Sequence, residues 1–177
     1  MHESIRGHCN GTATLKSNNE IRMETNNNTP TVECQMMIRK PAATVFQAFI
    51  DPAFTTKFWF TESSGPLEAG KTITWRWEMY DVSDNIKVKE IIPNQKITIE
   101  WDAPATTVDF EFTTLTEDTT YVVIKNYGFS QTGDDLIEAI KNNTSGFTTV
   151  LDGLKAYLEF GVELNLVRDK FPHIRHK

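Results

Sequence analysis

Apolar and polar residues alternate along the middle of the chain in the pattern of half-buried strands. The first such stretch, Val32–Ile38, has apolar residues at every second position, and five more stretches follow between residues 73 and 124. Short connections that contain turn-forming residues, such as residues 93–96 and 117–119, separate some of them. Because connections this short join neighbouring antiparallel strands, the pattern predicts a sheet built from hairpins.

Helical periodicity appears on both sides of these strands. After Pro41, which suits the first turn of a helix, apolar residues recur at helical spacing to Ile50, and Asp51 can begin a second short helix. Near the C-terminus, an apolar stripe runs from Phe147 to Gly161. The predicted order is therefore strand, helix pair, antiparallel sheet and long amphipathic helix. The sheet and the long helix should pack face to face, because each has a single apolar side.

Composition separates a polar N-terminal segment from the rest. The chain has 177 residues, of which 39% are apolar and 24% are charged. Residues 1–30 contain six Asn and no aromatic residue, so this segment cannot bury enough apolar surface to offset its ordering entropy. We expect residues 1–30 to be a disordered extension and residues 31–177 to form a single domain.

Charge and histidine placement exclude several classes of function. The net charge of −6 argues against a nucleic-acid partner, because phosphate binding needs clustered Lys and Arg. His2, His8, His173 and His176 all lie near a terminus, so the core has no imidazole for a catalytic triad or for a metal. The N-terminus lacks an apolar secretory segment, and no apolar run is long enough to span a bilayer. We expect a cytoplasmic protein, monomeric or weakly dimeric, with no metal and no cofactor.

Aromatic residues are concentrated in the predicted sheet and helices. All 19 lie between Phe46 and Phe171. Any one of them is ordinary core, but a strongly curved sheet around one helix can enclose more space than its side chains fill, and that space becomes an apolar ligand cavity. We expect the sheet and the long helix to form its walls and residues 54–60 to border its mouth. The candidate ligand-binding residues are Phe54, Phe58, Trp59, Phe60, Trp75, Trp77, Met79, Val88, Glu90, Trp101, Phe110, Phe112, Asn126, Phe147, Val150, Leu151, Leu154 and Leu158.

Two polar residues of this set share the inward parity of their strands. Glu90 follows Val88, and Asn126 follows Ile124, each two positions later. Both can orient the polar end of a ligand. They also have structural interpretations: a β-bulge or a basic partner for Glu90, and an amide that ties the strand end to the helix for Asn126. Asp109 lies on the opposite parity, and we expect it to be solvated.

Several sequence segments occur in an order typical of one protein family. They are Pro41–Phe60 with its Lys57-Phe-Trp-Phe60, Gly70–Trp75, Val88–Trp101, Ile124–Phe129 and Gly146–Glu159. Together they resemble the START-like, or SRPBCC, superfamily, and more narrowly the branch related to the C-terminal domain of the activator of the ninety-kilodalton heat-shock-chaperone ATPase. The resemblance implies an α+β helix-grip fold. In that fold a curved antiparallel sheet wraps around a long C-terminal α-helix, two short helices follow the first strand, and a cavity lies between sheet and helix.

The chain departs from the pattern of this branch at three places. Asn126 stands where many relatives carry His, and Phe147 stands where they often carry Trp. A role that depends on an imidazole in the last strand is therefore excluded. The tail at residues 161–171 extends beyond the generic helix, and the sequence assigns it no role.

The resemblance leaves three functions open, because the fold does not choose among them. The first is non-enzymatic binding of a small hydrophobic ligand, such as a lipid, a polyketide or another aromatic compound. The second is a protein-interaction module that acts on a chaperone ATPase. The third is a cyclase or dehydratase in which Glu90 is the catalytic base and Asn126 or Tyr127 donates a hydrogen bond.

Overall fold

A computed structural model describes residues 29–101 and 104–171. The expected disorder of residues 1–30 concerns residues outside this part, apart from residues 29 and 30. The strands are β1 (Val32–Ile38), β2 (Glu62–Ser63), β3 (Thr72–Trp77), β4 (Val82–Ile92), β5 (Lys96–Trp101), β6 (Thr106–Thr116) and β7 (Thr119–Tyr127). The helices are α1 (Ala42–Ile50), α2 (Pro52–Thr55), α3 (Gly133–Phe160) and α4 (Leu166–Lys170), with a 3-10 turn at Glu78–Tyr80.

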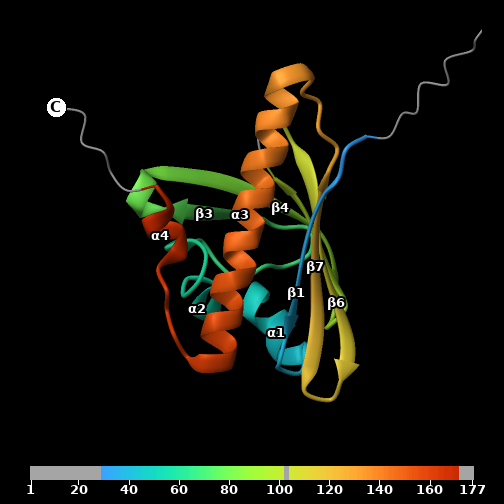
Figure 1. Ribbon diagram of the computed structural model, residues 1–177, viewed down its shortest axis with the longest axis vertical. Coiled ribbons are helices and arrows are strands. Elements are labelled where there is room, and N and C mark those ends of the chain that lie inside the picture. The colour runs from blue at the N-terminus through green and yellow to red at the C-terminus, as the bar shows by residue number, and fades with distance from the viewer. Residues whose placement is uncertain (1–28, 102–103, 172–177) are drawn as a thin grey trace, which may run out of the picture.

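The described strands form one antiparallel sheet in the order β1-β7-β6-β5-β4-β3-β2. Strands β3 to β6 each pair with the next strand in the sequence, as the predicted hairpins require. Figure 1 shows β1 and β7 running alongside α3, whereas β3 and β4 run across it, so the sheet bends around the helix. The α+β helix-grip architecture is therefore confirmed.

The strands place their apolar residues on the side that faces the helices. In β3, Ile73, Trp75 and Trp77 are buried and the residues between them are exposed. In β7, Val122 and Ile124 are buried in the same alternating way. Strand β3 ends at Trp77, because the chain then enters the 3-10 turn at Glu78–Tyr80, which Asp81 closes in the left-handed region.

Local sequence signals explain where the helices begin and end. The side chain of Asp51 accepts a hydrogen bond from the Ala53 backbone N–H at 2.9 Å, which caps α2. Gly161 ends α3 with a φ of 68°, a left-handed conformation that suits glycine. None of the helices in the described residues combines the length and the apolarity that a membrane crossing requires.

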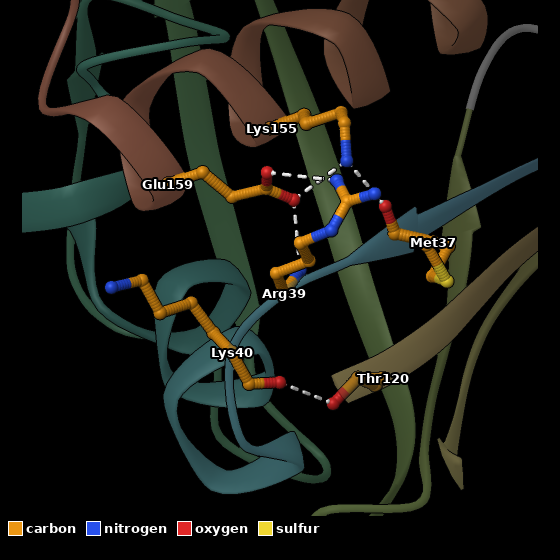
Figure 2. Close-up of polar contacts among 6 residues, drawn as sticks. All are labelled: Met37, Arg39, Lys40, Thr120, Lys155 and Glu159. Atoms are coloured by element: carbon orange, nitrogen blue, oxygen red, sulfur yellow. Dashed lines mark hydrogen bonds and ion pairs between the residues drawn. The ribbon is translucent and has the colours of Figure 1, made fainter. Parts of the chain in front are cut away.

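A polar cluster fastens the end of β1 to the last turns of α3 (Figure 2). The Glu159 carboxylate accepts hydrogen bonds from the Arg39 backbone N–H at 2.8 Å and from the Lys155 ammonium at 2.6 Å, and the Arg39 guanidinium lies 3.4 Å away. Lys155 also donates to the backbone oxygen of Met37 at 2.7 Å. Burial by itself raises the pKa of Glu159, but the hydrogen bonds and charges of Lys155 and Arg39 outweigh it and lower this pKa below its ordinary value.

We expect Glu159→Gln to lower the free energy of unfolding by about 1 kcal/mol at neutral pH. Because the folded-state pKa is depressed, the carboxylate stabilises the fold above the ordinary glutamate pKa of 4.5, and this contribution is lost as the pH falls through the folded-state value. Urea unfolding at pH 7 and at about pH 3.5 should show the difference between wild type and variant shrinking on acidification. A difference that stays constant between the two pH values would contradict this account.

Candidate functional site

A partly open cavity of about 530 Å³ lies between α3, the strand ends of β3 to β5 and the C-terminal tail. Its volume is within the range of small-molecule sites in proteins. From the sheet side and its connections, its lining residues are Trp59, Trp77, Tyr80, Val82, Asp84 and Trp101. From α3 and the tail they are Asn142, Asn143, Ser145, Gly146, Phe147, Thr149, Val150, Val167, Lys170 and Phe171.

Four aromatic rings form a continuous wall of this cavity. The indoles of Trp77 and Trp101 stack with ring centroids 6.0 Å apart and an interplanar angle of 5°. Trp59 meets the edge of Trp101 at 6.0 Å, and Phe147 of α3 also meets Trp101 at 6.0 Å. Trp77 and Trp101 are the last residues of β3 and β5, so the strand ends bring them together across β4. Each of the four rings therefore packs against at least one of the others, and together they form one aromatic surface.

Few polar groups interrupt this apolar wall. The Asp84 carboxylate accepts a hydrogen bond from the Trp101 indole N–H at 3.2 Å. The Lys170 ammonium donates to the Ser145 backbone oxygen at 2.6 Å and to the Thr149 hydroxyl at 2.9 Å. Burial lowers the pKa of Lys170. The site therefore offers one carboxylate and one ammonium, which lie on different elements.

The C-terminal tail, residues 161–171, completes the cavity. After α3 ends, the chain turns back, and α4 lies beside α3 near the β3–β4 end of the sheet (Figure 1). The Tyr80 hydroxyl donates a hydrogen bond to the Val167 backbone oxygen, and the rings of Tyr80 and Phe171 are 5.9 Å apart. Sequence reasoning missed this role. The signal that could have found it is the spacing of Val167 and Phe171, four residues apart as on one face of a helix.

The structure distributes the candidate residues over several environments. Those on the cavity wall are Trp59, Trp77, Trp101, Phe147 and Val150. Those in or against the packed core are Trp75, Val88, Phe110, Phe112, Leu151, Leu154 and Leu158. Those that border a second cavity of about 120 Å³, under the tail, are Phe58, Phe60 and Met79. Phe54 is exposed on α2.

Helix α1 explains why much of the sheet does not face the cavity. The ring of Phe49 lies 5.1 Å from Phe110 and 5.6 Å from Phe112, and Phe46 lies 5.5 Å from Phe112. These rings fill the part of the concave face near β6. The cavity therefore occupies only the part beneath residues 142–150 of α3.

The expected inward position of Glu90 is wrong. The pairing of β4 with β5 shifts register between Val88 and Glu90, and this β-bulge leaves Glu90 exposed. The structural interpretation of Glu90 as a bulge residue therefore holds. A catalytic base in the cavity cannot come from this side chain.

Asn126 is buried and ties two strands together. Its amide nitrogen donates to the Thr106 hydroxyl at 2.8 Å and to the Thr107 backbone oxygen at 3.1 Å. The Thr106 hydroxyl in turn donates to the Trp101 backbone oxygen at 3.2 Å. Asn126 thus supports the strand end that carries Trp101, whereas the structural interpretation from the sequence had tied it to the helix.

The expectation that Asp109 is solvated is also wrong. On the outer face of the sheet its side chain accepts hydrogen bonds from the Thr98 hydroxyl at 2.7 Å and from the Tyr127 hydroxyl at 3.2 Å, and the Lys96 ammonium lies 3.1 Å away. Asp109 is only 5% exposed because these neighbours cover it. Burial, together with the Asp109 carboxylate, raises the pKa of Tyr127. Tyr127 therefore faces away from the cavity and is not a hydrogen-bond donor there.

Within the described residues, no group of three or more His, Cys, Asp and Glu side chains is placed to hold a metal ion. The chemistry that the cavity offers is therefore that of aromatic surface, amides, hydroxyls and two opposite charges.

Comparison with known proteins shows where this architecture occurs. A protein from Staphylococcus saprophyticus is 32% identical, with a TM-score of 0.68 over 76% of this chain and 96% of that one. The Aha1 dimer from Colwellia psychrerythraea is 22% identical, with a TM-score of 0.64 over 75% and 98% of the two chains. DynU16, a protein from the dynemicin biosynthetic locus, is 18% identical, with a TM-score of 0.66 over 75% and 48%. The last two show the fold alone.

Sequence comparison adds the family. No curated protein shows a significant match to the chain. Residues 39–159 match the family described as Activator of Hsp90 ATPase homolog 1-like protein, and this range begins directly after β1 and contains strands β2 to β7 and nearly all of α3. The 32% identical staphylococcal protein also matches along 96% of its own length. The chain therefore belongs to the Activator of Hsp90 ATPase homolog 1-like family.

Proposed function

We propose that this protein binds a small, mainly apolar molecule in the cavity between the sheet and α3. The observation that carries the proposal is the cavity itself: about 530 Å³ with a wall of stacked and edge-on aromatic rings. Apolar ligand surface that enters such a site gains about 25 cal/mol per Å² of buried area, less the cost of immobilising the ligand. An aromatic compound suits the site best, because flat rings can stack on Trp77 and Trp101.

The cavity supplies its own reporter of binding. Three of the four Trp residues line it, namely Trp59, Trp77 and Trp101. A bound aromatic molecule should therefore quench the tryptophan fluorescence. Titration with a panel of flavonoids, fatty acids and sterols tests the proposal, and native mass spectrometry of freshly purified protein tests for a co-purifying small molecule. A panel without quenching, together with a mass spectrum of the bare chain, would count against ligand binding.

Gly146→Phe should weaken binding of any ligand found in this way by at least about tenfold. Gly146 lines the cavity, and no atom lies within 4 Å of the position that a Cβ would take there, so the new ring can enter the ligand space without a clash at Cβ. Ile137→Phe is the matched control, because it puts the same ring on an exposed position of α3 and should leave affinity unchanged. Equal affinity of the wild type and Gly146→Phe would place the ligand elsewhere.

A second candidate function is an interaction with a chaperone ATPase, which the description of the family suggests. Exposed apolar side chains of Phe160, Val162 and Leu164 at the end of α3 offer a surface for a protein partner. The similarity to a dimer also supports a weak homodimer as the oligomeric state. An ATPase assay with the purified chaperone separates the two functions, since stimulation that survives Gly146→Phe would not depend on the cavity.

A further inference from the structure

Lys170 is fixed on the cavity wall by two hydrogen bonds to one helix. It is the last residue of α4, and its ammonium donates to the backbone oxygen of Ser145 and to the hydroxyl of Thr149 on α3. A lysine ammonium carries three N–H donors, so these two bonds leave one donor for a group bound in the cavity. The fixed position makes Lys170 a preorganised contact.

Within the described part of the chain, Lys170 forms no salt bridge: no carboxylate oxygen there lies within 4.0 Å of its ammonium nitrogen. Seven other lysines do pair with a carboxylate: Lys57, Lys71, Lys89, Lys96, Lys125, Lys141 and Lys155. Burial lowers the pKa of Lys170, and among the described residues no carboxylate raises this pKa again. An ammonium held at an apolar wall in this way gains more from an anionic ligand group than a solvated lysine does.

The Asp84 carboxylate, the second charged group of the cavity, favours one orientation of a bound anionic ligand. Asp84 lies on β4 and is occupied by the indole N–H of Trp101, whereas Lys170 lies on α4. The two side chains do not form a salt bridge with each other within the described residues. An anionic group is therefore attracted to the tail side of the cavity and repelled from the strand side.

We propose that the ligand is an apolar monocarboxylic acid whose carboxylate binds the Lys170 ammonium and whose apolar body packs on the tryptophan wall. This inference rests on the proposed function and adds the chemical class of the ligand. It also gives the C-terminal tail a function, because Val167, Lys170 and Phe171 then bind the ligand directly.

The test compares two probes with one skeleton, naphthylacetate and naphthylethanol, by fluorescence titration at neutral pH. The wild type should bind the acid at least about tenfold more tightly than the alcohol, as expected for a charge-assisted hydrogen bond. Lys170→Met should remove this preference and keep the affinity for the alcohol. Lys141→Met is the control: Lys141 is a 71% exposed lysine on α3 that should leave both affinities unchanged.

The outcomes separate this inference from the proposed function. If the wild type binds both probes equally, or if Lys170→Met keeps the preference for the acid, the role of Lys170 is overturned while ligand binding stands. If neither probe nor any member of the wider panel binds, the proposed function itself fails. If Lys170→Met loosens the tail and loses both probes, Lys170→Gln decides, because it keeps an N–H donor without the charge. Loss of the acid preference in that variant supports the inference, and its retention overturns it.

Discussion

Replacing Trp75 by alanine is expected to lower the free energy of unfolding by about 3–5 kcal/mol, the usual cost of removing a large aromatic side chain from a packed core. The Trp75 side chain is only 2% exposed. Its ring stacks on Phe60 at 4.7 Å and lies 4.8 Å from Trp59 and 5.9 Å from Trp101. Urea unfolding followed by far-ultraviolet circular dichroism measures the loss without depending on the missing fluorophore.

The same experiment on two further variants shows whether burial causes the effect. Trp75→Phe keeps an aromatic ring and should lose less than Trp75→Ala. Phe160→Ala removes a ring that is 72% exposed and should change stability by less than about 0.5 kcal/mol. Trp75 also packs against the rings of Trp59 and Trp101, which line the cavity, so Trp75→Ala should weaken ligand binding as well. If Trp75→Ala lowers the free energy of unfolding by less than about 1 kcal/mol, the rings around Trp75 are loosely packed and this account is contradicted.

Gly153→Ala is expected to destabilise the protein by about 1–3 kcal/mol, although alanine is the better helix former. A Cβ at position 153 would lie 3.1 Å from the Cβ of Phe58 and 3.1 Å from its backbone oxygen. Phe58 is itself buried, and its ring packs 5.9 Å from Phe49, so this neighbour can move only with the segment that carries it. Glycine at 153 therefore sets how closely α3 approaches the chain after α2.

Gly146→Ala is the matched control, because it makes the same change in the same helix. No atom lies within 4 Å of a Cβ at that position, so helix propensity alone acts, and the variant should be more stable by about 0.5–1 kcal/mol. Thermal and urea unfolding of the two variants should therefore give shifts of opposite sign. If both variants stabilise the protein, the close approach at Phe58 relaxes at little cost.

The order of the elements and most of their inward faces could be predicted from the sequence. Alternation over two residues identified the strands around Trp75 and Ile124, and helical spacing identified α1 and the apolar stripe of α3. These patterns are local, because the backbone of a strand or helix determines which side chains share a face. The turn at residues 93–95 likewise joins β4 to β5, as its residue types predicted.

Two local features of the sheet could not be predicted from the sequence, because they depend on how neighbouring strands pair. One extra residue in β4 breaks the alternation of inward and outward side chains after Val88 and exposes Glu90. No residue type at this position indicates a β-bulge. On the outer face, Asp109 looked like a solvated charge, and only its cross-strand neighbours Lys96, Thr98 and Tyr127 bury it. Cross-strand contacts depend on register, which a single strand does not reveal.

The sequence by itself determined a curved antiparallel sheet facing one long helix, with tryptophan and phenylalanine between them. Only the tertiary structure decided which part of that interior stays open. Phe46 and Phe49 of α1 fill one part of the concave face, and the tail bends back to set Val167 and Lys170 over the other. The position and size of a cavity depend on how segments far apart in the chain pack together, and hydrophobic periodicity records only the face that each segment buries.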